Sequence, residues 1–277
     1  MKDALCCIAK MENDYIYDFV NYYKQIGVDK IYIYDNNDVD YEPLYDRIKE
    51  FVDNNFVEII DVKGGKNLQI PTYIHCWHNH RNEFDWMMFN DCDEYLFLKQ
   101  DKNIKDYLSR DIFNEYEMIH INWVMMDDGG LVKSNGRPLM ERCYPSAKAK
   151  ILDDRNFSCN YHIKSIIKCH NDKVGDLYSW NPHSPTNEGI RCCDDSGKEV
   201  DSKIPFVYKS TNKFAYIKHF HTKTIDEWIH NKIPKGYADH QMTLEEIKTK
   251  KIDYFFTLNE RTKEKEEYIK EILNKQK

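Results

Sequence analysis

Short apolar runs and amphipathic stretches follow one another along the first hundred residues of the chain. The runs are rich in residues that favour β-strands and predict four of them, at residues 5–9, 30–34, 56–61 and 86–89. The stretches between them repeat apolar residues every three or four positions and predict helices, at about residues 16–26, 44–51 and 69–82. This alternation predicts an α/β fold with a mostly parallel, twisted, Rossmann-like sheet flanked by helices.

The second half of the chain has a less regular pattern. Strands are expected at residues 118–123, 163–169 and 215–221, and loops at about 138–160 and 181–201. A helix is expected around Trp228, and two more from Leu244 onward. Because no internal repeat or low-complexity linker appears, we predict one catalytic domain at residues 1–240. Residues 241–277 are expected to form a helical extension that packs on it.

The composition describes an ordinary globular chain of 277 residues, long enough to bury a sizeable core. The formal net charge of -7 argues against a general nucleic-acid-binding protein, which usually carries a basic face. Nine cysteines without regular spacing indicate reduced thiols and a cytoplasmic protein. The first residues lack a signal-peptide core, and no apolar run reaches the roughly 18 residues of a membrane span.

The last 17 residues are locally basic, but four glutamates are interleaved with the lysines. This pattern favours a solvated amphipathic helix. Contact of these lysines with an anionic membrane is the alternative, and it would place the protein peripherally at the inner face of a membrane.

Carboxylates follow the strand predicted at residues 86–89 at once, as Asp91, Asp93 and Glu94. Burying such groups unpaired would cost roughly several kcal/mol each, so the cluster needs a cation or solvent. The carboxyl edge of a parallel sheet is where ligands bind in open α/β folds. Carboxylate oxygens suit Mg²⁺ and Mn²⁺, which commonly bridge to phosphates. An acidic turn exposed to water is the alternative, and the pair of aspartates by itself does not exclude it.

Polar residues also follow the first two predicted strands: Lys10 and Glu12 after the first, and Asp35 and Asn36 after the second. Polar strand ends are what a nucleotide cleft requires, although such loops are polar in most proteins. The sequence contains no glycine-rich dinucleotide fingerprint and no Walker A motif, which argues against those two kinds of nucleotide site.

Several stretches share their order and spacing with one known group of enzymes. They are residues 9–12, residues 26–36, Gln69, the Asp-Cys-Asp-Glu-Tyr-Leu segment within residues 86–96, Asn122-Trp123, Lys164-Ser165, residues 219–224, Lys232 and Gly236. Together they resemble glycosyltransferase family 92 and related family 2-like glycosyltransferases, over roughly residues 4–236. The chain departs from that pattern at Lys10-Met11, where Arg-Asn is usual, at Thr224, where Ser is usual, and near residues 126–128. These departures leave the donor sugar and the acceptor open.

The resemblance implies a GT-A fold, a nucleotide-diphosphate sugar donor, Mn²⁺ or Mg²⁺ as cofactor, and inverting transfer. It assigns the metal mainly to Asp93, while Asp91 faces the ribose or shares the metal. A late histidine completes such sites, and His219 and His221 both fit that position. Strand alternation puts these two histidines on one face, which suits joint ligation or two surface histidines. With the resemblance we favour ligation, and His221 slightly over His219.

The remaining donor contacts are assigned by position. Lys10, Glu12, Asp35 and Asn36 would contact the base or ribose. Gln69 would lie near the diphosphate or sugar at a helix start. Two late lysines, Lys223 and Lys232, would supplement the phosphate contacts, although lysines on a helix are more often solvated.

Inverting transfer needs a general base near the acceptor hydroxyl. Asp127 and Asp128, which precede Gly129-Gly130, are the first choice because a glycine turn lets the backbone come close to an acceptor. Glu94 is the second choice. An ordinary turn explains Asp127 and Asp128 nearly as well.

The sequence therefore predicts a metal-dependent hexosyltransferase. It would move a hexose, with galactose as a candidate, from a UDP-sugar to a glycan or lipid-linked glycan acceptor in surface polysaccharide or lipopolysaccharide synthesis. A sugar-nucleotide nucleotidyltransferase is one alternative, but residues 5–12 lack the glycine-rich loop that it would need. A non-catalytic nucleotide-sugar-binding module is the other, and the presence of Asp91, Asp93 and His221 argues against it.

Overall fold

The computed structural model describes residues 1–150, 157–170, 181–184, 189–235 and 251–275. Two compact units make up the chain, and each contains two separate segments. The first unit comprises Met1–Trp123 and Asn160–Lys218, and the second comprises Val124–Cys159 and His219–Lys277. The boundary predicted at residue 240 lies outside the described residues, so the division at that point stays a prediction.

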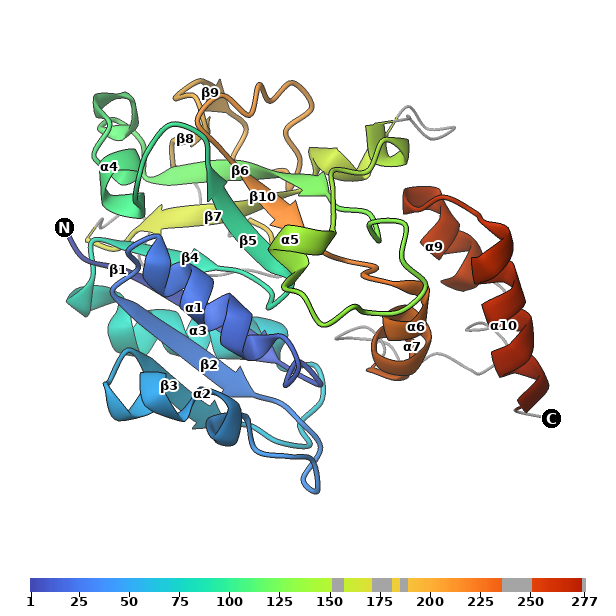
Figure 1. The fold of residues 1–277 in the computed structure, drawn as a ribbon. Coiled ribbons are helices and arrows are strands. Elements are labelled where there is room, and N and C mark those ends of the chain that lie inside the picture. The colour runs from blue at the N-terminus through green and yellow to red at the C-terminus, as the bar shows by residue number, and fades with distance from the viewer. Residues whose placement is uncertain (151–156, 171–180, 185–188, 236–250, 276–277) are drawn as a thin grey trace. The chain divides into compact units, whose positions relative to one another are not determined.

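Four parallel strands form one half of the sheet in the first unit (Figure 1). They lie in the order β3-β2-β1-β4 and comprise β1 (Asp3–Ala9), β2 (Lys30–Asp35), β3 (Val57–Asp61) and β4 (Trp86–Phe89). The helices between them are α1 (Ile16–Gln25), α2 (Leu44–Asp53) and α3 (Gln69–His80). These elements confirm the alternation predicted for the first hundred residues, and with it the α/β fold class.

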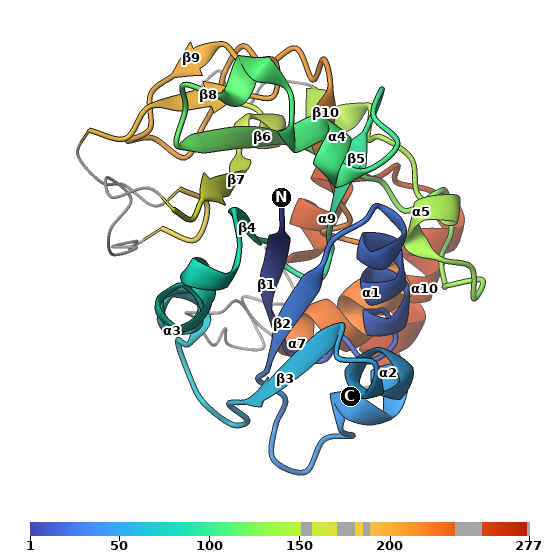
Figure 2. The ribbon, with the colours of Figure 1, turned by 90° about the vertical axis from the view of Figure 1, so that its left-hand side faces the viewer.

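Helices cover both faces of this parallel half. Figure 2 shows α3 on one side of β1, β2 and β3, with α1 and α2 on the other. Successive side chains of a strand point to opposite faces, so each strand must be apolar on both. On the α3 side, Cys6, Tyr32 and Tyr34 pack with Tyr73 and Trp77 in one buried cluster. Double burial explains why these strands read as continuous apolar runs in the sequence.

The remaining strands extend the sheet beyond β4. The order continues β4-β7-β6-β10-β5, with β8 beside β6 and β9 beside β8. They are β5 (Glu94–Leu98), β6 (Met118–Met125), β7 (Ile163–Lys168), β8 (Cys192–Asp194), β9 (Glu199–Val200) and β10 (Ala215–His219). Strand β7 runs antiparallel to both β4 and β6. The strands expected near residues 118, 163 and 215 are confirmed.

Among the described residues of the first unit, three strands and one α-helix were not predicted. Strands β8 and β9 are three and two residues long and lie in a segment expected to be loop. Strand β5 begins at Glu94, inside the carboxylate cluster, and α4 (Ile104–Leu108) has only five residues. Strands β8 and β9 and helix α4 have too few positions to show a periodic pattern, so packing rather than local sequence selects them.

The described part of the second unit consists of short helices and loops, together with the last residues of β6 and β10. It contains α5 (Leu139–Arg142), α6 (Ile225–Glu227), a π-helical turn (Trp228–Lys232), α7 (Ile233–Lys235), α9 (Ile252–Leu258) and α10 (Lys263–Lys275). Its core gathers around Trp228, whose ring is buried with Phe255 and Phe256. The Trp228 indole N–H donates to the Lys251 carbonyl at 3.1 Å. The helix expected near Trp228 and helices in the C-terminal tail are confirmed. Among the described residues, every helix is too short or too polar to cross a membrane.

A buried histidine makes the first unit sensitive to acid. His120 in β6 is completely buried, and its Nε2 atom lies 3.2 Å from the Ser184 hydroxyl. Burial disfavours the charged imidazolium and lowers the pKa of His120 to about 3.

Acidification below pH 6.5 is therefore expected to destabilise the protein, because the unfolded chain binds a proton at His120 that the folded chain does not. Lowering the pH from 7.5 to 5.5 should cost about 1.4 kcal/mol of unfolding free energy through this residue. A His120→Gln variant, which keeps a polar side chain of similar size, should lose that part of the pH dependence. Urea unfolding of both proteins at the two pH values measures it, and identical pH dependences would contradict the assignment.

Candidate active site

A tyrosine of α1 holds the turn that carries the predicted metal-binding carboxylates. The buried hydroxyl of Tyr23 donates to the Glu94 carbonyl at 2.8 Å. It accepts from the Asn90 side-chain amide at 2.8 Å and from the Leu96 backbone N–H at 3.0 Å. One hydroxyl thus uses its donor and both acceptor sites to fix both ends of the turn after β4. The sequence suggested only that Tyr23 lies on an apolar helix face, although a buried tyrosine usually needs a partner for its hydroxyl.

The carboxylates of Asp91 and Glu94 share a buried ammonium. Lys164 Nζ lies 3.2 Å from Asp91 Oδ2 and 3.3 Å from Glu94 Oε2. Burial raises the pKa of Glu94 well above its usual value, although Lys164 and the Asp91 N–H oppose that rise. For Lys164, burial alone lowers the pKa, but the attraction of Asp91 and Glu94 outweighs it and raises the pKa above its usual value. No role was predicted for Lys164. The signal for it is a lysine inside the apolar run of β7.

Helix α3 supplies two further partners of Asp91. Gln69, the first residue of the helix, donates its side-chain amide to Asp91 Oδ1 at 2.7 Å. Tyr73, one turn later, donates its hydroxyl to the same oxygen at 3.2 Å. The predicted donor-binding residue Gln69 is thus brought to the predicted metal-binding turn. Asp93 is 2% exposed in the same turn.

The predicted nucleoside contacts lie at the ends of β1 and β2. Asn36 donates its side-chain amide to the Val62 and Gly65 carbonyls at 3.0 and 2.9 Å. Lys10 pairs with Asp38 at 3.3 Å, and Glu12 is buried. Asn37, the next residue after Asn36, links the two strand ends, because its Oδ1 accepts from the Met11 backbone N–H at 2.7 Å.

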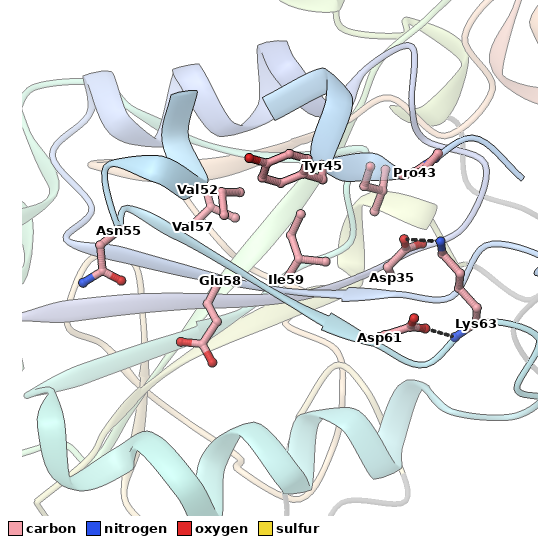
Figure 3. A pocket seen from close by; sticks show the side chains of 11 residues that line it. Asp35, Pro43, Tyr45, Val52, Asn55, Val57, Glu58, Ile59, Asp61 and Lys63 are labelled. Atoms are coloured by element: carbon pink, nitrogen blue, oxygen red, sulfur yellow. Dashed lines mark hydrogen bonds and ion pairs between the residues drawn. The ribbon is translucent and has the colours of Figure 1, made fainter. Parts of the chain in front are cut away.

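A cavity of about 520 Å³ lies between α2 and the edge strand β3 (Figure 3). Asp35 lies at one end of it, where its carboxylate pairs with Lys63 Nζ at 3.6 Å. Tyr45 of α2 and Ile59 of β3 contribute apolar surface. None of residues 91–94 lines this cavity, so it shares only Asp35 with the predicted donor site. We therefore base the candidate site on the carboxylate turn and not on this cavity.

The second unit contains the two predicted histidine ligands. The ring centroids of His219 and His221 are 5.1 Å apart, and both histidines are at least partly buried. The His221 ring also packs against Trp228 and Tyr254. The predicted pairing of these two histidines on one side of the chain is therefore present within this unit.

The two predicted phosphate-binding lysines also lie in the second unit. Lys223 is buried and adopts a positive φ of 53°, a conformation that non-glycine residues adopt only with strain. Lys232 is partly buried at the end of the π-helical turn. Their contact with phosphate stays a prediction.

The two predicted general bases differ in their surroundings. Asp127 accepts the Gly129 and Tyr144 backbone N–H groups at Oδ1, both at 2.9 Å. Asp128 is buried, and its Oδ2 atom lies 2.5 Å from Nζ of the buried Lys265. Burial raises the pKa of Asp128, against the opposing effects of Lys265 and the Gly130 N–H. The ion pair with Lys265 gives Asp128 a structural role that the sequence did not reveal.

Gly129 has a steric reason to be glycine. Its φ is +63°, and a Cβ atom added there would lie 1.8 Å from the Arg142 carbonyl oxygen. The turn predicted at Gly129-Gly130 therefore serves backbone packing. The close approach of an acceptor at this turn stays a prediction.

Comparison with known proteins gives a family match over most of the chain. The sequence model described as Glycosyltransferase family 92 matches residues 2–233. A curated glycosyltransferase family 92 protein of Ricinus communis is 28% identical over 103 residues, which is 37% of this chain and 18% of that protein's length. The chain thus spans less than a fifth of this relative in the aligned region.

Solved structures of S. aureus TarS are also similar. The crystal structure of TarS residues 1–349 is 12% identical, with a TM-score of 0.43 and coverage of 93% of this chain and 72% of that chain. The complex of the same TarS segment with UDP-GlcNAc is 11% identical, with a TM-score of 0.44 and coverage of 94% and 74%.

Removing the Tyr23 hydroxyl should destabilise the first unit. A Tyr23→Phe variant leaves the Glu94 carbonyl, the Asn90 amide and the Leu96 N–H buried without this partner, so we expect a loss of about 2–4 kcal/mol in unfolding free energy. Urea unfolding measures it. A matched Tyr22→Phe variant removes a single bond to the Leu96 carbonyl and should cost less. Equal losses in the two variants would contradict the central role of Tyr23.

Replacing each of the two neighbouring aspartates should change the unfolding free energy by different amounts. Asp128→Asn breaks a buried ion pair and strands the Lys265 ammonium, which should cost about 3–5 kcal/mol. Asp127→Asn keeps an Oδ1 acceptor for both N–H groups and should change the unfolding free energy by less than about 1 kcal/mol. Urea denaturation of both variants measures the difference, and an inverted order would show that the ion pair is not structural.

Proposed function

Because the chain belongs to glycosyltransferase family 92, we propose that it is a glycosyltransferase that moves a hexose from a UDP-sugar to a glycan or lipid-linked glycan acceptor with inversion. Galactose is the first candidate for the hexose. The observation that carries the proposal is the family match across residues 2–233, which contains the Asp91-x-Asp93 turn. That turn follows the carboxyl end of β4, the edge at which open α/β sheets bind ligands.

The proposed metal ligands are Asp93, His219 and His221, with Asp91 beside them. A carboxylate suits Mg²⁺ and Mn²⁺, whereas imidazole nitrogen suits transition metals better than Mg²⁺, so this donor set favours Mn²⁺. The burial of Asp93 also fits, because a buried carboxylate favours a nearby cation. When bound, the cation would offset the negative charge that develops on the leaving diphosphate.

The chain's own residues would orient the donor. Lys10, Glu12, Asp35 and Asn36 are proposed to contact the nucleoside, since they follow adjacent parallel strands. Gln69 would lie beside the diphosphate or sugar, because it is already fixed against Asp91 at the start of α3. Lys223 and Lys232 would contribute positive charge to the diphosphate.

Asp127 is the proposed general base that accepts the proton of the acceptor hydroxyl. The structure gives a reason to rank it above the other two candidates. Asp128 would have to leave its ion pair with Lys265, and Glu94 is completely buried against Lys164. Asp127 has a partly exposed side chain whose known bonds are to backbone N–H groups at one oxygen.

The proposed setting is surface polysaccharide or lipopolysaccharide synthesis in the cytoplasm, with peripheral contact at the inner face of the membrane as an option. This part follows from the donor class and the reduced cysteines predicted from the sequence. All nine cysteines are free of disulfides in the structure.

Screening UDP-, GDP- and dTDP-sugars for Mn²⁺-dependent hydrolysis tests the function, because a transferase that binds its donor also transfers the sugar slowly to water. We expect one UDP-hexose to be hydrolysed. Asp93→Asn should reduce that rate at least about 100-fold, since it removes charge stabilisation of the leaving group. The matched control Asp46→Asn changes an exposed aspartate on α2 and should leave the rate unchanged.

Two outcomes would contradict parts of this proposal. Hydrolysis that is indifferent to Mn²⁺ and to chelators would remove the metal assignment. If every nucleotide sugar is stable while UDP still binds in calorimetry, the chain is a nucleotide-sugar-binding module and not a transferase.

A further inference from the structure

Lys164 is a completely buried lysine whose ammonium group pairs with acidic side chains of the protein. Its side chain is 1% exposed in the middle of β7. Lysines are almost never buried to this extent unless they are paired with an acid. Its ammonium is shared between Asp91 Oδ2 at 3.2 Å and Glu94 Oε2 at 3.3 Å. These three groups therefore form one charge network, in which Lys164 and Glu94 are buried and Asp91 is partly exposed.

Both oxygens of Asp91 are engaged by protein donors. Oδ2 pairs with Lys164 from β7, and Oδ1 accepts the Gln69 amide and the Tyr73 hydroxyl from α3. The Asp91 backbone N–H donates to Glu94 Oε2 at 2.9 Å, which fixes the main chain as well. A cation at Asp91 Oδ2 would lie beside the like-charged Lys164 ammonium, and a cation at Oδ1 would compete with the Gln69 and Tyr73 donors.

We propose that Lys164 is a positioning residue that keeps Asp91 away from the cation and leaves Asp93 as the acidic ligand of the pair. Its ammonium also offsets negative charge in the turn, so it weakens cation binding and favours release of the cation with the diphosphate product. This inference rests on the proposed function, because it assigns roles within the same metal site.

The inference predicts that metal affinity and turnover change in opposite directions. The test variant is Lys164→Met combined with Glu94→Gln, which removes the buried acid and its cation together, so that Glu94 is not left as an uncompensated buried charge. We expect it to bind Mn²⁺ alone at least threefold more tightly than the wild type, because Asp91 becomes available to the ion. Donor hydrolysis should fall at least tenfold, because the turn is no longer fixed. A merely structural lysine would lower both quantities or neither.

Two further variants test whether the gain in Mn²⁺ affinity comes from Asp91 and is specific to Lys164. Adding Asp91→Asn to the double variant should return the Mn²⁺ affinity to the wild-type value, because the gain comes from Asp91. Lys168→Met is the matched control on the same strand. Its ammonium contacts only the Phe113 and Asn114 carbonyls among the hydrogen-bond partners seen, so Mn²⁺ affinity should not change.

Electron paramagnetic resonance of free Mn²⁺ gives the affinities without reference to activity. Unchanged or weaker Mn²⁺ binding by the double variant overturns the inference. If wild-type binding is below detection, the appearance of binding in the double variant supports it, and continued absence overturns it. If circular dichroism shows that the double variant is unfolded, the Mn²⁺ affinity of the single variant Asp91→Asn tests the inference instead. Its Mn²⁺ affinity should stay within threefold of wild type, and a loss as large as that of Asp93→Asn overturns the inference.

Failure of the proposed function would give a different result. Absence of donor hydrolysis in the wild type contradicts the transferase assignment, whereas the order of the Mn²⁺ affinities reports only on Lys164 and Asp91.

Discussion

The buried charge behind the carboxylate turn is the constraint on which the first unit depends. Three acidic side chains lie within four residues, and two of them share one ammonium in the interior. Removing these charges from water is costly, so the surrounding elements must hold donors in fixed positions to compensate for it. Strand β7 contributes Lys164, α3 contributes Gln69 and Tyr73, and α1 contributes Tyr23. The parallel half of the sheet and its helices on both faces therefore converge on this one turn.

In this arrangement, the residues that fix the turn are different from the residue that is assigned to the cation. Lys164, Tyr23 and Tyr73 lie in the interior, where they fix the backbone and the first aspartate. Asp93 follows in the same turn and is the residue to which the family pattern assigns the cation. A site built in this way has its geometry set before any ligand arrives, so little conformational entropy has to be lost on binding.

The sequence predicts the regular part of this fold well and the supporting interactions poorly. Strands β1 to β4 and their helices follow from the sequence, because the strands are apolar runs and the helices repeat an apolar pattern. The strand at Glu94 does not, since it begins within the carboxylate cluster and the burial of Glu94 depends on Lys164, which lies 70 positions later in the chain. Pairings such as Asp128 with Lys265 join residues more than a hundred positions apart, and local sequence carries no signal for them. The contact between Gln69 and Asp91 was not predicted either, although the family pattern assigns both residues to the donor site.

The division of the chain has a consequence for how the protein is made. Each unit consists of two segments, and the chain passes from one unit to the other after Trp123, Cys159 and Lys218. A ribosome that has released the first 123 residues has produced β1 to β5 but not Lys164, so the acidic turn emerges before its counter-charge. The carboxylates of this turn therefore have no Lys164 partner until β7 is synthesised, and water must solvate them in the nascent chain. Because each unit consists of two separate segments, neither unit can be obtained by a simple truncation. Expressing one unit alone requires a rearranged or split chain.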